Sequence, residues 1–315
     1  MIKVVVTDLE YNKAASVFKN AGGFECIPAP SDEVGLAARV RETGARFAII
    51  GVTRYCNELY DAIPAGGVIA RFGVGHDGVD KVRARSRGIL CCNTPGVLDD
   101  SVAECAIGLM LAAARHIASC SADNRGGVWK FRLGTELSGK TLAIIGCGEI
   151  GRRVARIAKC GFGMKIAGFD VKKPQDTSAI DAFTHDFAAA VKDADFVSVH
   201  LPEIFSTRDF INCDRLSLMK PSAILINTAR GGVLDEKALY DALAAGLIAG
   251  AALDVFKTEP YVPQHPEKDL RSLAGIVMTP HIGSGTREAC ERMAAAALKN
   301  IALAAEGRTA EMALV

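Results

Sequence analysis

The sequence lacks an excess of charge of either sign, because 37 lysines and arginines stand against 36 aspartates and glutamates among its 315 residues. It also has no basic block and no acidic tail. Proteins that bind nucleic acid or an anionic membrane usually carry a concentrated positive patch. We therefore expect a small molecule as the partner of this chain, and neither nucleic acid nor a membrane.

Long hydrophobic runs are also absent, since no stretch of 18 apolar residues occurs. The first residues, MIKVVVTD, enter a β-rich stretch directly, without the regions of a secretory signal. The ten cysteines lie scattered, without the paired spacing of zinc ligands or the density of a disulfide-stabilised domain. We expect reduced cysteines, no metal site and a cytoplasmic protein.

Half of the residues are hydrophobic, which is enough for two cores in a chain of this length. Two series of short β-branched runs alternate with helical stretches, and this alternation is typical of parallel sheets with crossover helices. The first series comprises IKVVVTD, FECIPAP, FAIIGVT, VIARFGVG and GILCCNTP. The second comprises KTLAIIG, KIAGFD, FVSVHLP, AILINTARG, AGAALDVF and GIVMTPHIG.

An apolar stretch at residues 101–120 lies between the two series and predicts one long helix. Asp99, Asp100 and Ser101 stand at its start and can cap the first N–H groups. A helix this apolar needs either a core or a second subunit to cover it, and both alternatives stay open. We place a domain boundary at its start.

A glycine-rich loop follows the first strand of the second series. Gly146, Gly148 and Gly151 stand between an apolar run and a helical stretch. In such a loop the first glycine permits a tight turn, the second lets the backbone approach a diphosphate, and the third lets the helix pack on the strand. The helix N-terminus then binds the diphosphate. The pattern predicts a dinucleotide cofactor.

Asp170 indicates which dinucleotide is bound. It lies nineteen residues after Gly151, at the end of the next strand, where a carboxylate can accept hydrogen bonds from an adenosine ribose. This carboxylate would repel the 2′-phosphate of NADP, so the sequence favours NAD. Lys172 and Lys173 weaken the preference, because either could neutralise an added phosphate.

Three strand ends of the second series carry ionisable residues, Arg230, Glu259 and His281. The carboxyl ends of parallel strands meet at the edge of the sheet that binds ligands. We predict that Arg230 binds a carboxylate or a polarised carbonyl, and that His281 exchanges a proton with the substrate. Glu259 then favours and orients the imidazolium. Gly231 and Gly232 are expected to leave space for substrate beside Arg230.

With these motifs the sequence resembles the D-isomer-specific 2-hydroxyacid dehydrogenases, a family that includes phosphoglycerate, glycerate and D-lactate dehydrogenases. The resemblance covers almost the whole chain. It rests on RFGVGHDGVD, NTPGVLDDSVAE, GKTLAIIGCGEIG, VSVHLP, INTARGGVLDE, ALDVF and TPHIGSGT, in the family's order and approximate spacing. It implies an NAD-dependent oxidoreductase that interconverts a small 2-oxo acid and a D-2-hydroxy acid, with Arg230, Glu259 and His281 as catalytic residues.

Further site residues follow from the resemblance alone. It implies that the backbone of Val74 and Gly75 binds the substrate carboxylate, together with Arg230. To the cofactor contacts predicted above, Gly146, Gly148, Gly151 and Asp170, it adds Glu149, Ile150, Leu201, Pro202, Thr228, Ala229 and Asp254.

The resemblance also implies an α/β fold with two doubly wound parallel-sheet domains. Residues 1–98 and 285–315 would form a flavodoxin-like substrate domain, and residues 99–284 a Rossmann NAD-binding domain inserted into it. Family members commonly dimerise through the helix at residues 101–120, so we expect a homodimer.

Two departures from the family bear on the substrate. Phosphoglycerate-specific members carry an Arg-Ser pair after the third strand, where this chain has Ile50 and Gly51, with Arg54 slightly later. Substrates of the glyoxylate and hydroxypyruvate type and of the phosphoglycerate type both stay open, because a displaced arginine can still reach a phosphate. Residues 261–275 match the usual short connection poorly, and no function is assigned to them.

Two other functions are compatible with the same fold. One is an NADH-sensing binding protein, similar to the corepressors that share the fold and keep the three ionisable residues. The other is formate oxidation, in which glutamine typically accompanies the histidine, and Glu259 argues against it. Turnover of 2-oxo acids distinguishes an enzyme from a sensor.

Overall fold

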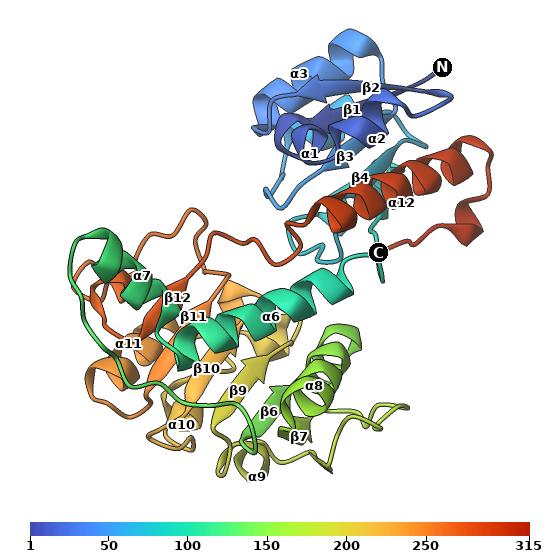
Figure 1. Ribbon diagram of the computed structural model, residues 1–315. Helices are drawn as coiled ribbons and strands as arrows, with labels where there is room; N and C mark the ends of the chain where they lie inside the picture. The colour runs from blue at the N-terminus through green and yellow to red at the C-terminus, as the bar shows by residue number, and fades with distance from the viewer. The chain divides into compact units, whose positions relative to one another are not determined.

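The structure is a computed structural model that describes residues 1–315, and it divides into two compact units (Figure 1). The first unit comprises residues 1–98 and 284–315, and the second comprises residues 99–283. The sequence-based division differs by one residue, because it placed the second boundary after residue 284. Each unit contains one parallel sheet, as the sequence predicts.

The first unit has a five-stranded parallel sheet in the order β2-β1-β3-β4-β5, which is the expected flavodoxin-like order. All five strands match predicted runs. They are β1 (Ile2–Thr7), β2 (Phe24–Ala29), β3 (Phe47–Ile50), β4 (Val68–Arg71) and β5 (Leu90–Cys92). Strands β3 and β4 are buried along their whole length, as is typical of parallel strands covered on both faces.

Helices from both ends of the chain complete the first unit. They are α1 (Asp8–Lys13), α2 (Ala15–Lys19), α3 (Glu33–Thr43), α4 (Glu58–Ala62), α5 (Lys81–Ser86), α12 (Arg287–Ala305) and the short 3-10 helix η4 (Thr309–Glu311). Helix α12 packs against β4 and α2, so the last residues of the chain join the fold of the first.

The second unit has a seven-stranded parallel sheet in the order β12-β11-β10-β9-β6-β7-β8. Its strands are β6 (Thr141–Ile145), β7 (Lys165–Phe169), β8 (Ala182–Thr184), β9 (Phe196–Val199), β10 (Ile224–Asn227), β11 (Gly250–Leu253) and β12 (Ile276–Met278). Six of them were predicted. The sequence did not reveal β8, because it is three residues long and none of them is buried. Chain order reverses between β6 and β9, which is where doubly wound sheets bind dinucleotides.

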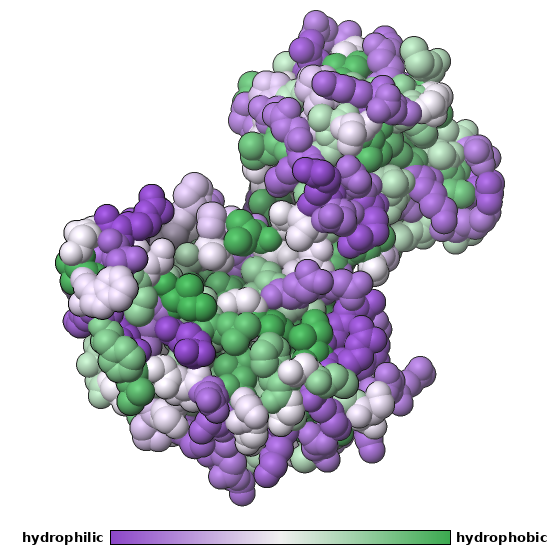
Figure 2. Space-filling view, viewed as in Figure 1, coloured by the Kyte–Doolittle hydropathy of each residue, from purple (hydrophilic) through white to green (hydrophobic).

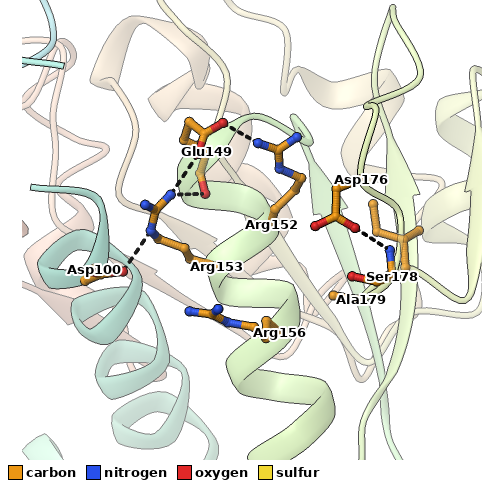
Figure 3. A pocket seen from close by; sticks show the side chains of 9 residues that line it. Asp100, Glu149, Arg152, Arg153, Arg156, Asp176, Ser178 and Ala179 are labelled. Atoms are coloured by element: carbon orange, nitrogen blue, oxygen red, sulfur yellow. Dashed lines mark hydrogen bonds and ion pairs between the residues drawn. The ribbon is translucent and has the colours of Figure 1, made fainter. Parts of the chain in front are cut away.

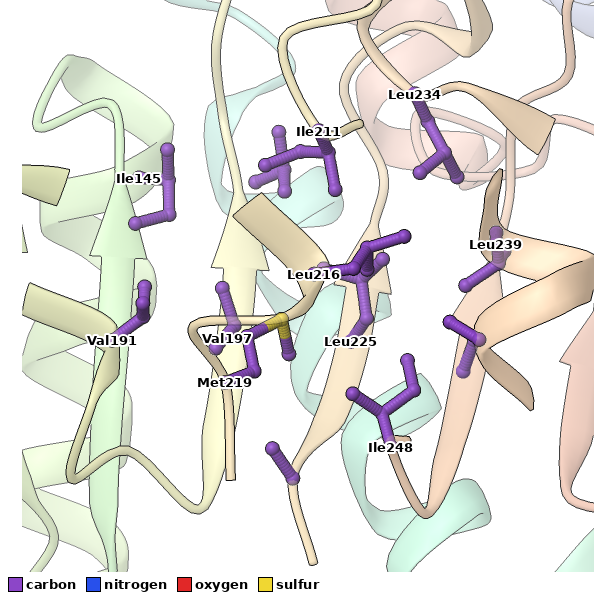
Figure 4. Packing of buried hydrophobic residues seen from close by; sticks show 14 of the residues in the cluster. Ile145, Val191, Val197, Ile211, Leu216, Met219, Leu225, Leu234, Leu239 and Ile248 are labelled. Carbon is purple, nitrogen blue, oxygen red and sulfur yellow. The ribbon is translucent and has the colours of Figure 1, made fainter. Parts of the chain in front are cut away.

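Helices cover this sheet on both faces. They are α6 (Asp99–Ala114), α7 (Ile117–Arg125), α8 (Glu149–Phe162), α9 (Phe187–Val191), α10 (Cys213–Leu216) and α11 (Glu236–Ala244), with 3-10 helices η1 (Phe205–Thr207), η2 (Gly231–Val233) and η3 (Leu270–Ser272). On one face, strand residues such as Val197 and Leu225 pack against Leu216 of α10 and Leu239 of α11 (Figure 4). Each of these side chains is almost fully buried, which stabilises the fold by about 1.5–3 kcal/mol per residue.

The predicted helix at residues 101–120 is in fact two helices. Helix α6 ends at Ala114, α7 begins at Ile117, and the two axes differ by 63°. The carbonyl oxygen of Ala114 accepts a hydrogen bond from the N–H of Thr135 at 2.9 Å, and His116 adopts a left-handed φ of 53°. The prediction was wrong here because a distant segment, rather than a proline or glycine in the run, ends the helix.

Helix α6 packs against α8, β10, β11 and β12, and only Glu104 and Gly108 in its interior turns are exposed. Core packing therefore accounts for the buried apolar residues of the helix, while Cys105, Leu111 and Ala112 stay partly exposed. No single helix of the chain is both long and apolar enough to cross a membrane, and only the bent pair of α6 and α7 taken together reaches that length and hydropathy.

Candidate active site

The loop from β6 to α8 has the geometry that dinucleotide binding requires. Gly146 has a φ of 100°, and a Cβ there would lie 2.7 Å from the carbonyl oxygen of His200. A Cβ on Gly151 would lie 2.1 Å from the carbonyl oxygen of Gly146, so only glycine lets α8 approach the strand this closely. Gly148, the N-cap of α8, would meet nothing within 4 Å. The backbone is open where a diphosphate would meet the helix N-terminus.

Asp170 follows β7 directly and is hydrogen bonded to the glycine loop. Its Oδ2 accepts from the N–H of Cys147 at 2.8 Å, and its Oδ1 accepts from the N–H of Lys172 at 3.2 Å. These bonds hold the carboxylate beside the loop, and each oxygen keeps a lone pair for a ribose hydroxyl. Lys172 and Lys173 are exposed next to it.

Thr228, the first residue after β10, has a buried hydroxyl without a partner. The residue is 7% exposed, and its Oγ1 makes no hydrogen bond. An unpaired buried polar group costs about 1–3 kcal/mol, so this hydroxyl fits a hydrogen-bonding group of a bound cofactor. Leu201 and Pro202 follow β9, the strand next to β10, and so emerge at the same edge of the sheet.

Glu149 and Ile150 form the first turn of α8, and the Glu149 carboxylate is paired with two arginines of the same helix. It contacts Arg152, and it accepts from Arg153 at 2.9 Å. The hydrogen bond from Arg153 and the charge of Arg152 lower the pKa of Glu149. A hollow on this side of α8 is lined by Asp100, Glu149, Arg152, Arg153, Arg156, Asp176, Ser178, Ala179 and Ile180 (Figure 3). None of the three predicted catalytic residues lines it, so we do not place the reaction there.

Arg230 lies in a turn that is stabilised by the buried side-chain amide of Asn227. The side chain of Asn227, which is fully buried, donates to the carbonyl oxygen of Arg230 and accepts from the N–H of Ala229, both at 3.0 Å. The guanidinium Nη1 donates to the carbonyl oxygen of Ala229 at 2.7 Å. The guanidinium is therefore held at the carboxyl end of β10.

Glu259 and His281 form a direct pair. Oε2 of Glu259 lies 2.7 Å from Nδ1 of His281, and Oε1 accepts from the N–H of Phe256 at 3.0 Å. Burial opposes ionisation of Glu259, but the hydrogen bond and charge of His281, the Phe256 N–H and the charge of Arg230 together lower the pKa of its carboxyl. With Nδ1 bonded to the carboxylate, Nε2 is the ring nitrogen available to a substrate.

Asp254 holds the loop that carries His281. Its Oδ1 accepts from the hydroxyl of Thr279 at 2.6 Å and from the N–H of Ile282 at 2.8 Å, and its Oδ2 accepts from the N–H of Gly283 at 2.7 Å. The N–H of His281 donates to the carbonyl oxygen of Asp254 at 2.8 Å. Every hydrogen bond of this carboxylate goes to the 279–283 loop, and a cofactor contact by Asp254 stays a prediction.

The space beside Arg230 is filled, contrary to the expectation that Gly231 and Gly232 leave room for substrate. A Cβ on Gly231 would lie 1.9 Å from the carbonyl carbon of Phe256. A Cβ on Gly232 would lie 2.4–2.5 Å from the carboxylate atoms of Glu203. The two glycines instead let the chain before Glu259, and the loop after β9, pack directly on the turn that carries Arg230.

Glu236, in the first turn of α11, was not singled out from the sequence. It is 5% exposed, its Oε1 accepts from the N–H of Lys257 at 2.7 Å, and its Oε2 is buried without a partner. Burial raises the pKa of this carboxyl. The only sequence signal was its place in the motif INTARGGVLDE. Glu236 fixes the backbone two residues before Glu259.

Val74 and Gly75, in the first unit, follow β4. The turn before them is held by Thr94, whose hydroxyl accepts from the N–H of Gly73 at 3.0 Å, and by Asn93, whose amide donates to the carbonyl oxygen of Val74 at 2.7 Å. Both residues are partly exposed, and no hydrogen bond engages their own N–H groups. These two donors fit the predicted binding of a carboxylate.

Comparisons with known proteins agree with this geometry. Residues 107–283 match the sequence profile described as the D-isomer specific 2-hydroxyacid dehydrogenase, NAD binding domain. The chain is 43% identical to a glyoxylate reductase of Thermococcus litoralis over 282 residues, which are 86% of this chain and 83% of that protein. It is 44% identical to a hydroxypyruvate reductase of Thermotoga maritima over 238 residues, 74% of this chain and 76% of that one.

A solved structure is similar over the whole fold. The NADPH-dependent glyoxylate/hydroxypyruvate reductase of Sinorhizobium meliloti, in complex with NADP and malonate, has a TM-score of 0.84 and 31% identity, and the match covers 100% of this chain and 96% of that one. The glycine loop, the paired Glu259 and His281 and these similarities agree. The chain belongs to the D-isomer-specific 2-hydroxyacid dehydrogenases, a family of oxidoreductases that use a nicotinamide cofactor.

Proposed function

We propose that this protein reduces small 2-oxo acids of the glyoxylate and hydroxypyruvate type to D-2-hydroxy acids, and that it catalyses the reverse reaction as well. The observation that carries this proposal is the 2.7 Å pair of Glu259 and His281 at the sheet edge that also bears the glycine loop and Arg230. The names of the two similar reductases support the substrate type.

In the reaction that we propose, a reduced nicotinamide cofactor held by the glycine loop and Asp170 would supply the hydride that C2 of the 2-oxo acid accepts. Arg230 donates hydrogen bonds to the substrate carboxylate or carbonyl and so stabilises the charge that develops on the carbonyl oxygen. His281 gives the proton on Nε2 to that oxygen, which completes the hydroxyl group. Glu259 accepts the hydrogen bond from Nδ1, which keeps the ring oriented and favours its protonated form before the transfer.

Val74 and Gly75 bind the substrate carboxylate in this proposal, through their two available N–H groups. Ile150, Leu201, Pro202 and Ala229 contact the cofactor mainly through backbone and apolar atoms.

We further propose that NAD(H) is preferred over NADP(H). The Asp170 carboxylate lies beside the glycine loop, where an adenosine ribose would bind, and it would repel a 2′-phosphate. Lys172 and Lys173 are the groups that could offset this repulsion, and the similar reductase of Sinorhizobium meliloti binds NADP. The ratio of kcat/KM for NADH and NADPH decides between the two cofactors.

A homodimer is part of the proposal. Hydrophobic residues gather on the face of the second unit that α6 lines (Figure 2). The segment after α7 adds Trp129, Phe131 and Leu133, which are 92%, 84% and 83% exposed. Contiguous exposed apolar groups of this kind usually mark a protein interface. Light scattering measures the mass in solution directly. The cytoplasmic location inferred from the sequence stays a prediction.

The decisive experiment measures oxidation of NADH and NADPH with glyoxylate, hydroxypyruvate, pyruvate, phosphohydroxypyruvate and a bulky 2-oxo acid. We expect turnover of the small acids and loss of turnover in His281→Ala. Binding of NADH without turnover of any 2-oxo acid would instead support the NADH-sensing alternative.

A further inference from the structure

The first unit has its own ligand-binding edge. Its chain order reverses between β1 and β3, and open α/β sheets bind ligands at the carboxyl ends of strands that flank such a reversal. Val6 pairs with Ile49, and Ile50 pairs with Arg71, so β1, β3 and β4 end at the same level. The loop with Val74 and Gly75 leaves β4 at this edge.

Glu10 places a buried carboxylate at the point of reversal. It lies three residues beyond β1 and is 4% exposed. Its Oε1 accepts from Nζ of Lys13 at 3.1 Å, and its Oε2 accepts from the hydroxyl of Thr7. Two protein donors leave further acceptor positions on a carboxylate, which has about four. Lys13 and Thr7 offset the cost of burying this charge, and the remaining acceptor positions can take a hydrogen bond from a ligand at this edge.

Gly51, the first residue after β3, makes room for this carboxylate. A Cβ at this position would lie 2.4–2.6 Å from Cδ and the two oxygens of Glu10. The Glu10 carboxylate therefore occupies the space into which a side chain at position 51 would project. It lies on the ligand edge of β3 rather than on the outer surface of α1.

Positive charge lies on the other side of the same edge. Arg71, the last residue of β4, is 7% exposed, and a Cβ on Gly73 would lie 2.6 Å from its Nη1. The guanidinium therefore lies against the turn that leads to Val74 and Gly75. Because β3 and β4 are neighbouring strands, about 4.8 Å apart, the Glu10 carboxylate over Gly51 and the turn that leads to Val74 and Gly75 lie at adjacent strand ends.

We propose that Glu10 determines which 2-oxo acids the enzyme accepts, by accepting a hydrogen bond from a hydroxyl group on C3 of the substrate. The inference rests on the proposed function and on binding of the substrate carboxylate at Val74 and Gly75. A carboxylate has no proton to donate, so it binds a hydroxyl but cannot hydrogen bond to an ionised phosphate or a second carboxylate at C3, which have only acceptors. The preferred substrate class is 3-hydroxy-2-oxo acids, and 3-phosphorylated acids are disfavoured.

The test compares substrates that differ only at C3. Hydroxypyruvate and pyruvate differ by one hydroxyl group, and glyoxylate has no C3 and serves as the internal control. Glu10→Gln keeps the size of the side chain and removes its charge. We expect it to lower kcat/KM for hydroxypyruvate on the order of tenfold, as loss of a charge-assisted hydrogen bond does, and to leave glyoxylate within about twofold. The relative rate with phosphohydroxypyruvate should rise.

Gly51→Ala tests the same idea without removing the charge, because its Cβ would displace the Glu10 carboxylate from its position. We expect the ratio of kcat/KM for hydroxypyruvate to kcat/KM for pyruvate to fall as it does in Glu10→Gln. Glu25→Gln, at an exposed position on β2, is the matched control. It should change neither the ratio of kcat/KM for hydroxypyruvate to that for pyruvate nor the relative rate with phosphohydroxypyruvate. Circular dichroism melting of each variant checks that it is folded.

The outcomes separate the two proposals. If the ratio of kcat/KM for hydroxypyruvate to that for pyruvate is unchanged in both Glu10→Gln and Gly51→Ala, the role of Glu10 is overturned. The proposed dehydrogenase function is not affected by that result. Equal losses with hydroxypyruvate, pyruvate and glyoxylate also overturn the role of Glu10, because they indicate a structural effect. Failure of the unaltered protein to reduce any 2-oxo acid overturns the proposed function, and this inference with it.

Discussion

The carboxylate of Glu236 accepts a hydrogen bond from the backbone N–H of Lys257 at 2.7 Å, across 21 positions of the chain. The backbone of Phe256 and Lys257 also packs on Gly231. The N–H of Phe256 donates a hydrogen bond to Oε1 of Glu259. Glu236 thus connects the start of α11 to the turn that carries the partner of His281. No part of this connection touches a substrate, but it fixes where the Glu259 carboxylate lies.

Replacing Glu236 tests this connection. Glu236→Ala leaves the partly buried N–H of Lys257 without its partner, and an unpaired buried group costs about 1–3 kcal/mol. We expect a lower melting temperature and a lower kcat, with KM for the cofactor unchanged. Burial raises the pKa of Glu236, so a neutral side chain is tolerated at this position. Glu236→Gln should therefore keep most of the melting temperature and of kcat. Glu267→Ala, at an exposed position, is the control, and identical losses in the Gln and Ala variants would contradict the positioning role.

Arg230 and His281 should differ in which kinetic constant they affect. Arg230→Ala removes a group that binds substrate in the ground state and in the transition state, so KM should rise and kcat should fall. His281→Ala removes the proton donor, and we expect kcat to fall by roughly 10²–10⁴-fold with little change in KM. Steady-state kinetics with glyoxylate measures both constants. Near-normal rates in either variant would exclude that residue from the chemistry.

Asp170→Asn should change cofactor preference. The amide oxygen can still accept from the N–H of Cys147, but the charge is gone, so the repulsion of a 2′-phosphate disappears. We expect the ratio of kcat/KM for NADH to that for NADPH to fall about tenfold. A ratio equal to that of the unaltered protein would show that other residues, such as Lys172 and Lys173, set the preference.

The pair of Glu259 and His281 should make stability depend on acid pH. The pKa of Glu259 is lowered from the ordinary value of 4.5, so its ionised form stabilises the folded state above that value. The contribution is lost as the pH falls through the lower pKa of the folded state. Urea midpoints measured between pH 7 and pH 3 should therefore fall less steeply in Glu259→Gln than in the unaltered protein. Parallel curves for the two proteins would contradict this linkage.

Local patterns in the sequence were enough for much of this protein. Continuous β-branched runs predicted eleven of the twelve strands, because a parallel strand buried on both faces is apolar throughout. Gly146, Gly148 and Gly151 indicated a dinucleotide loop, because the positive φ of Gly146 and the close approach of Gly151 to Gly146 are demands within the loop itself. Arg230, Glu259 and His281 could be picked out because each lies within about six residues after a strand, and parallel strands bring such residues to one edge.

Only the tertiary structure decided the rest, because it depends on contacts between segments far apart in the chain. Helix α6 ends where the N–H of Thr135 donates a hydrogen bond to the carbonyl oxygen of Ala114, and no residue within 101–120 predicts this end. Gly231 is packed against Phe256, although the sequence suggested open space there. The carboxylate of Glu10 lies over Gly51 only because β1 and β3 are neighbours in the sheet. The pattern of apolar residues indicates which faces of a segment are buried. Which other segment packs against those faces is determined by the fold of the whole chain.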